Sequence, residues 1–283
     1  MRVLITGAVG QLGSAMVAEF SRGHDVVPLT IEDLDLTRHA DVMARISREK
    51  PEAIINCAAY TDVDGAEDHP QAALEVNAFA VKSLAAAARE TGAVLVHYST
   101  DFVFDGRADR PYTEQDQPEP RSFYAISKLL GEWFARDAAR HLILRVESLF
   151  GGVTGDAPGK RSSVDKIIDA IRAGREARVF VDRTVTPSYV VDVAAATRFL
   201  LERSGPFGLY HSVNSGACTW FDLAQEVARE LGVNARLLAV PVAAVTMRAA
   251  RPKYCALSNA KLAAIGFEMP TWQDALARHL RAA

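Results

Sequence analysis

Val3-Leu4-Ile5-Thr6-Gly7-Ala8-Val9-Gly10-Gln11-Leu12-Gly13 opens the chain and decides its fold. The stretch begins as a short, continuous apolar run, which is typical of a buried parallel strand. Three glycines at intervals of three residues come next, and a helical pattern runs from Ser14 to Phe20. Glycines permit a tight turn and let backbone N–H groups approach a pyrophosphate, while the helix N-terminus adds its positive dipole end. We interpret the stretch as a dinucleotide-binding loop in preference to an ordinary strand-to-helix turn, because a βαβ pattern follows it.

Strands and helices alternate over the rest of the first half. Apolar runs predict strands at 26–29, 53–57, 94–98 and 142–144, and helical spacing predicts helices at 40–49, 71–89 and 124–139. This alternation is typical of an α/β fold with a Rossmann-type, doubly wound parallel sheet.

The second half of the chain has shorter predicted elements and more loops, so we expect a smaller C-terminal substrate-binding subdomain there. The expected division is 1–150 for the NAD(P)-binding domain and 151–283 for the subdomain, with about 178–215 returning to the first domain. A polar, glycine-rich loop at 151–161 is a candidate for mobility over a site.

The bulk composition excludes several classes of protein. The 283 residues are 49% apolar and 24% charged, and the net charge of -3 gives little support to nucleic-acid or membrane-surface binding. No apolar run approaches the length that spans a bilayer, and the N-terminus reaches glycine too early for a signal peptide. Three separated cysteines, Cys57, Cys218 and Cys255, suggest neither a zinc site nor a disulfide framework. We therefore expect a reducing, cytoplasmic location.

Polar or small residues follow three of the predicted strands at their carboxyl ends. They are Gly7, then Ala58-Ala59-Tyr60, then Ser99-Thr100. Ligands of doubly wound sheets bind beyond the carboxyl ends of the strands. We expect these residues to line one crevice although they are distant in sequence.

Tyr124 and Lys128 form a Tyr-x-x-x-Lys pair on the helix that follows the Thr100 strand. Helical spacing places the two side chains on one face. An unperturbed tyrosine has a pKa of about 10, and a neighbouring ammonium would lower it toward the range useful for proton transfer. We interpret Thr100, Tyr124 and Lys128 as a catalytic set; the alternative is a solvated lysine and a partly buried aromatic ring.

The sequence leaves the choice between NAD and NADP open. Glu32 and Asp33 lie near the distance from the glycine loop at which a carboxylate holds a ribose 2′-OH, and no arginine occurs between Thr30 and Leu36, although Arg38 follows. The expected cofactor is therefore NADPH or NADH. No metal site is predicted, since the adjacent residues Glu67, Asp68 and His69 would point in different directions.

Several motifs together resemble the dTDP-4-dehydrorhamnose reductase family, whose members are extended short-chain dehydrogenases/reductases. The most specific is Ser99-Thr100-Asp101-Phe102-Val103-Phe104-Asp105-Gly106. The others run over nearly the whole chain: the 5–13 loop, 56–64, Val76-Asn77, 124–132, Thr186-Pro187-Ser188-Tyr189 with Asp192, 210–216, and Arg251-Pro252-Lys253-Tyr254 with Leu257-Ser258.

The resemblance implies reduction of the 4-keto group of a nucleotide-linked 6-deoxyhexose, in the family the last step of dTDP-L-rhamnose synthesis. Thr100, Tyr124 and Lys128 would carry the chemistry, and Asp101 and Phe102 would face the substrate. The residues that would bind the cofactor are Gly7, Gly10, Gln11, Leu12, Gly13, Asp35, Leu36, Ala58, Ala59 and Tyr60, with Tyr124 and Lys128. The implied assembly is a monomer or a homodimer.

Three positions depart from the family pattern. Phe102 stands where the family commonly has tyrosine, and Ser14-Ala15 stand where some members have a Mg²⁺-binding glutamate. The segment 145–150 also differs, which leaves the sugar open. Related dehydratases carry Asp-Glu after the threonine, so Asp101-Phe102 favours ketone reduction over loss of water; Asp101 could alternatively cap the loop.

Two other functions remain as alternatives. One is a regulatory subunit that binds cofactor without catalysis, like the partner of methionine adenosyltransferase. The other is a sugar-nucleotide epimerase, which would keep the same three catalytic residues but return its hydride.

Overall fold

The protein, described by a computed structural model over residues 1–152, 161–203 and 205–282, is built on one six-stranded sheet. All neighbouring strands in this sheet are parallel, in the order β10-β5-β4-β3-β1-β2. The strands are β1 (Arg2–Thr6), β2 (Asp25–Leu29), β3 (Ala53–Asn56), β4 (Val94–Thr100), β5 (His141–Val146) and β10 (Gly208–His211). The chain goes from β1 to β2 on one side and then to β3 on the other, so the order reverses beside β1. Such a reversal creates a crevice at the carboxyl ends of the strands.

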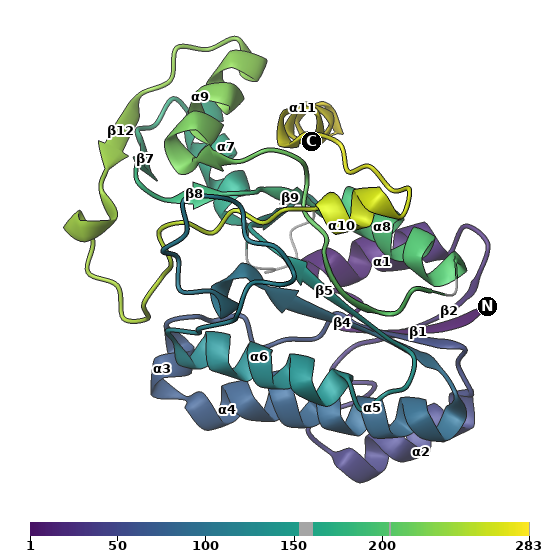
Figure 1. The fold of residues 1–283 in the computed structure, drawn as a ribbon. Coiled ribbons are helices and arrows are strands. Elements are labelled where there is room, and N and C mark those ends of the chain that lie inside the picture. The colour runs from purple at the N-terminus through teal and green to yellow at the C-terminus, as the bar shows by residue number, and fades with distance from the viewer. Residues whose placement is uncertain (153–160, 204, 283) are drawn as a thin grey trace.

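Helices cover both faces of this sheet, as Figure 1 shows, and the predicted α/β, Rossmann-type fold is confirmed. One face carries α1 (Gln11–Phe20) and α8 (Val190–Glu202), which pack on each other. The opposite face carries α2 (His39–Glu49), α5 (Ala80–Thr91) and α6 (Phe123–Ala135). Because both faces are covered, the strands are apolar throughout rather than alternating.

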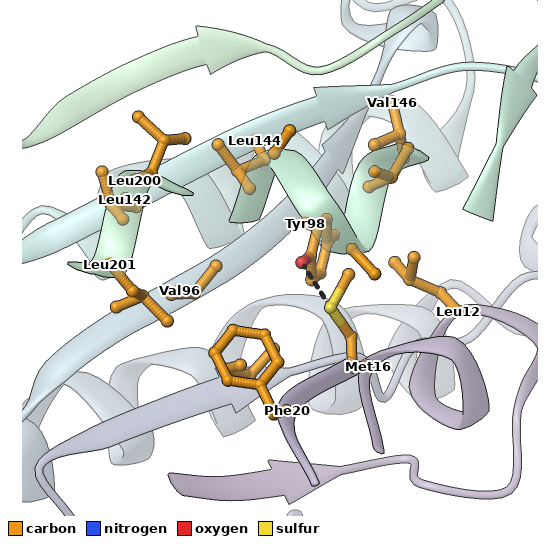
Figure 2. Close-up of a cluster of buried hydrophobic side chains, with 14 of the residues drawn as sticks. Leu12, Met16, Phe20, Val96, Tyr98, Leu142, Leu144, Val146, Leu200 and Leu201 are labelled. Atoms are coloured by element: carbon orange, nitrogen blue, oxygen red, sulfur yellow. Dashed lines mark hydrogen bonds between the residues drawn. The ribbon is translucent and has the colours of Figure 1, made fainter. Parts of the chain in front are cut away.

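The core between the sheet and α1 contains the buried Tyr98 among mainly aliphatic side chains (Figure 2). Tyr98 of β4 points toward α1, and its hydroxyl donates to Met16 Sδ at 3.5 Å. The same hydroxyl shares a 2.7 Å hydrogen bond with Thr197 Oγ1 of α8. The phenol therefore has partners on both covering helices, as a buried hydroxyl requires.

The helix predicted at 71–89 is not one continuous α-helix. It consists of α4 (Pro70–Leu74), a π-helix η1 (Glu75–Phe79) and α5, and it is preceded by the short α3 (Gly65–Asp68). A π-turn inserts an extra residue, and such bulges are frequent at functional sites. It also brings Gly131 of α6 close, since a Cβ there would lie 2.2 Å from the Asn77 carbonyl oxygen.

A second hydrophobic core lies in the C-terminal half, formed mainly by α7, α9 and α11. Both α7 and α9 begin with a capping box, Ser162 with Asp165 and Thr219 with Asp222. The bounds of these helices are α7 (Ser163–Arg172), α9 (Trp220–Leu231) and α11 (Trp272–Ala282). Three small two-stranded sheets pair β7 (Ala177–Phe180) with β12 (Leu237–Val240), β8 (Thr184–Val185) with β11 (Cys218–Thr219), and β6 (Leu149–Phe150) with β9 (Ser188–Tyr189). The remaining short elements are α10 (Ala260–Ala264) and the 3₁₀ turns η2 (Asp101–Val103) and η3 (Val242–Ala244).

Only part of the segment 178–215 lies on the main sheet. Its α8 and β10 do so, whereas β7 pairs with β12 outside it. The division at residue 150 stays a prediction. Most of the loop predicted at 151–161 falls at 153–160, outside the described residues. Among the helices of the described residues, none is both long and apolar enough to cross a bilayer.

Candidate active site

The glycine loop is too tightly packed to accept side chains. Gly7 has a φ of +64°, and a Cβ at this position would lie 2.8 Å from the Ala58 backbone nitrogen. A Cβ at Gly13 would lie 2.1 Å from the Gly7 carbonyl oxygen, whereas the Gly10 N–H donates to that oxygen at 3.0 Å. Gly10 is the N-cap residue of α1, and no side chain forms a capping hydrogen bond there. This bare backbone at a helix N-terminus fits the pyrophosphate of a dinucleotide, with Gln11 and Leu12 in the first helical turn.

The other predicted cofactor residues lie along the carboxyl edge of the sheet. Asp35 accepts hydrogen bonds from the Thr37 N–H (3.0 Å) and hydroxyl (2.7 Å), and it lines an open groove of about 690 Å³ beyond β2. Leu36 is buried in the core beneath. Arg38 and Arg45 line the groove together with Glu32, Asp33 and Asp41, so its charge is mixed.

The segment Ala58-Ala59-Tyr60 is held at Tyr60 by Asn77, a residue that was not among the predicted site residues. The Tyr60 N–H donates to Asn77 Oδ1 at 2.9 Å, and Asn77 Nδ2 donates to the Tyr60 carbonyl at 3.0 Å. The same Nδ2 donates to Ser127 Oγ at 3.0 Å, on the helix of Tyr124 and Lys128. The π-helix thus joins the loop that contains Tyr60 to α6, the helix of Tyr124 and Lys128.

Thr100 and Asp101 meet where β4 ends. The Thr100 hydroxyl donates to Asp101 Oδ1 at 2.9 Å and accepts from the Phe102 N–H at 3.2 Å. This contact caps the turn η2. The capping residue is therefore Thr100, and Asp101 is a buried carboxyl facing it, only 2% exposed.

Tyr124 opens α6, and Lys128 lies one turn further along on the same helix. Ser122 caps this helix by accepting from the Ala125 N–H at 3.2 Å. The Phe102 ring packs edge-to-face on the Tyr124 ring, with centroids 5.7 Å apart. Phe102 therefore contacts both Thr100 and Tyr124, and Lys128 follows Tyr124 on the same helix; the catalytic role of this set stays a prediction.

Burial dominates the electrostatics of the tyrosine–lysine pair. It raises the pKa of Tyr124, a negative charge on Asp101 would raise that pKa further, and the Thr100 hydroxyl acts in the opposite direction. Burial lowers the pKa of Lys128 to about 8, against the charges of Glu132 and Cys57. Lys128 Nζ donates to the Tyr98 carbonyl at 2.5 Å, which leaves two of its three donors for a ligand.

A further group of polar side chains lies beside Asp101. It comprises Glu147, Arg183 and Cys255, all buried, and none was selected as a site residue from the sequence. The departure of 145–150 from the family pattern was the one available signal. At the glycine loop, the Ser14 hydroxyl donates to the Gln11 carbonyl at 3.1 Å, so this position supplies no carboxylate for a metal.

Comparison with known proteins places the chain. The family described as RmlD substrate binding domain matches residues 1–283. The chain belongs to this family. The predicted resemblance is thereby confirmed, over the full length of the chain.

Several named reductases are similar to this chain over nearly the full length of both chains. The dTDP-4-dehydrorhamnose reductase of Burkholderia thailandensis is 35% identical, covering 98% of this chain and 97% of its own. A probable dTDP-4,6-dihydroxy-2-methyloxan-3-one 4-ketoreductase of Streptomyces antibioticus is 37% identical, with coverages of 98% and 93%. The crystal structure of dTDP-4-dehydrorhamnose reductase from Bacillus anthracis, in complex with NADP, superposes with a TM-score of 0.93 at 33% identity over 100% and 99% of the two chains.

Proposed function

We propose that the protein is an NAD(P)H-dependent reductase of the 4-keto group of a nucleotide-linked 6-deoxyhexose, converting dTDP-4-dehydrorhamnose to dTDP-L-rhamnose. The observation that carries this proposal is the grouping of Thr100, Tyr124 and Lys128 at the carboxyl edge of the sheet, beside the glycine loop. Relatives of the same length are named as dTDP-linked ketoreductases, and one is in complex with NADP.

The proposed chemistry assigns one role to each side chain. When bound, NAD(P)H supplies the hydride that reduces the carbonyl carbon. Tyr124 donates its phenolic proton to the carbonyl oxygen, and the Thr100 hydroxyl orients that oxygen toward the phenol. The Lys128 ammonium stabilises the resulting phenolate and offers its two remaining N–H donors to the cofactor ribose. General acid catalysis of this kind contributes roughly 10²–10⁴-fold.

Lys128 is shielded from water more fully than Tyr124, which is partly buried. Lys128 is only 4% exposed, and Phe102 covers one side of the Tyr124 ring. Electrostatic interactions are stronger in such a site than in bulk water. The same burial explains why the tyrosine needs both a hydroxyl and an ammonium to give up its proton.

We infer from the three free thiols that the protein works in a reducing compartment, the cytoplasm. We also propose that the protein is a monomer or a homodimer and that its substrate is a nucleotide sugar.

The test is to follow NADPH and NADH oxidation against a panel of dTDP-, GDP- and UDP-linked 4-keto-6-deoxy sugars. Stoichiometric oxidation with the dTDP-linked substrate is expected. Conversion of a sugar without net cofactor oxidation would identify an epimerase instead, because an epimerase returns its hydride. Cofactor binding without any conversion would favour a regulatory subunit.

A further inference from the structure

Four chain segments that are distant in sequence meet beside Tyr124. Asp101, Glu147 and Cys255 each place one ligand-type atom within 4.8 Å of the other two. Arg183 lies against the same group, and its Nη2 donates to Cys255 Sγ at 3.7 Å. The four side chains belong to residues no more than 9% exposed, so this polar group is closed to bulk water.

Each of the two carboxyls has one satisfied and one unsatisfied oxygen. Asp101 Oδ1 accepts from the Thr100 hydroxyl, and Glu147 Oε2 accepts from the N–H (2.7 Å) and hydroxyl of Thr186. Asp101 Oδ2 and Glu147 Oε1 are buried and have no partner among the described residues. Buried polar atoms normally have a partner, so these two oxygens require an explanation.

The positive charge near these oxygens can balance one ionised carboxylate but not two. Among the described residues, Arg183 is the cation that acts on both carboxyls. Its Nε donates to the Pro252 carbonyl at 3.2 Å, and its guanidinium stacks over Phe102 at 5.4 Å. Within the described residues it forms no ion pair with Asp101 or Glu147. Burial raises the pKa of both carboxyls, and a negative charge on Asp101 would raise the pKa of Glu147 further, so the two carboxyls oppose each other's ionisation. A second buried negative charge is therefore strongly disfavoured.

We propose that Asp101 and Glu147 share a single proton, and that Glu147 thereby acts as a positioning residue that keeps Asp101 uncharged beside Thr100 and Tyr124. The two donors from Thr186 stabilise the negative charge on Glu147, so the proton belongs mainly to Asp101. A proton on one of the two unsatisfied oxygens removes one of the two buried charges and makes that oxygen a donor, within a cluster whose ligand-type atoms lie within 4.8 Å of one another. The Arg183 guanidinium disfavours the alternative, a divalent cation held by the same atoms.

The consequence for catalysis, which rests on the proposed function, is electrostatic. Tyr124 becomes a phenolate when it gives up its proton, and a charged Asp101 would oppose that charge. The other titratable or charged groups that face the pair are Arg183 before β8, Cys218 of β11, and Tyr254 and Cys255 near the C-terminus. Of these, Arg183 is the permanent charge, so the shared proton decides the net charge of the cluster.

An infrared measurement on the resting protein tests the shared proton without any substrate. At pH 7 the wild-type protein is expected to show a protonated-carboxyl C=O band that shifts in D₂O. Both Glu147→Gln and Asp101→Asn should lose this band, since the remaining carboxyl ionises beside Arg183. Absence of the band in the wild-type protein, its persistence in either variant, or a stoichiometric divalent metal in the purified protein would overturn the proposal.

The pH profile of turnover tests the link to Tyr124. In Glu147→Gln, Asp101 carries the charge, so kcat should fall and the basic limb of its pH profile should move up by roughly 0.5–1 pH unit. Cofactor affinity should stay constant. Glu226→Gln on α9 is the matched control and should leave the limb in place, while adding Asp101→Asn to Glu147→Gln should return it. An unmoved limb in an active Glu147→Gln variant overturns the link, whereas absence of turnover in the wild-type protein refutes the proposed function and leaves the infrared result to decide.

Discussion

The Asn77 side chain pairs with the backbone of Tyr60 through both of its amide atoms, at 2.9 and 3.0 Å. Asn77 lies in the π-helix, and its Nδ2 also reaches Ser127 on the catalytic helix. One side chain therefore links the loop at Tyr60, which we propose binds the cofactor, to α6, which carries the proposed proton donor Tyr124.

Replacing Asn77 by alanine should weaken cofactor binding. The Tyr60 N–H and carbonyl would lose their partners, at a cost of about 1–3 kcal/mol in the free energy of unfolding. NADPH titration by fluorescence and urea unfolding measure the two effects. Asn77→Asp keeps the acceptor and should lie between the wild-type protein and Asn77→Ala; equal NADPH affinity in all three would refute this role.

The glycine loop should distinguish between two similar substitutions. In Gly13→Ala the new Cβ would lie 2.1 Å from the Gly7 oxygen, so the backbone has to move and cofactor affinity should fall at least about 10-fold. In Gly10→Ala the corresponding distance is 3.2 Å and φ is -71°, so the effect should be much smaller. The two dissociation constants for NADPH are the measurement, and a larger loss in Gly10→Ala would contradict the packing described.

Lys128→Met should stabilise the protein at neutral pH while lowering turnover. Burial lowers the pKa of Lys128 to about 8 from the ordinary 10.5, so the folded state is penalised for carrying this charge below pH 8. Between these two values the unfolded chain binds more protons, and the wild-type protein gains stability as the pH rises. The expected gain of Lys128→Met is about 1–3 kcal/mol at pH 7, narrowing by pH 10. A gain that did not change with pH would contradict the titration of Lys128.

The buried ion pair of Arg145 and Glu132 should be essential to stability. Arg145 Nε and Nη2 donate to the two Glu132 oxygens at 2.8 Å each, and both side chains are at most 1% exposed. Glu132→Gln leaves a buried guanidinium without its counter-charge and should cost about 3–5 kcal/mol in urea unfolding. The exposed pair of Glu226 with Arg229 is the control, and Glu226→Gln should cost less than about 1 kcal/mol. Similar losses in the two variants would mean that burial of the pair does not matter.

Local patterns were sufficient to predict the parallel sheet and the alternation of its strands and helices, and they also selected the Thr100–Tyr124–Lys128 set, whose role stays a prediction. These features depend on continuous apolar runs, on glycine spacing and on a four-residue helical repeat, all of which are short-range. The π-helix was missed because Gln71–Arg89 has ordinary helical spacing, and the extra residue is stabilised by the contacts of Asn77 with a distant loop.

The buried cluster could not be predicted, because its members come from four separate segments. Glu147 lies after β5, Arg183 before β8 and Cys255 after η3, and the fold alone brings them to Asp101. Family motifs lie close to Arg183 and Cys255 in the sequence, at 186–189 and 251–258, but they do not select either residue as part of a site. For the same reason, fewer elements of the C-terminal half than of the main sheet could be predicted from the sequence.

The turnover of Tyr124→Phe with a dTDP-linked 4-keto-6-deoxyhexose tests the central claim most directly. NADPH oxidation is followed in the wild-type protein and the variant, with the dissociation constant of NADPH measured in parallel. If Tyr124 donates the proton to the carbonyl oxygen, kcat falls about 10²–10⁴-fold in Tyr124→Phe while NADPH affinity is unchanged. Turnover close to that of the wild-type protein would contradict it.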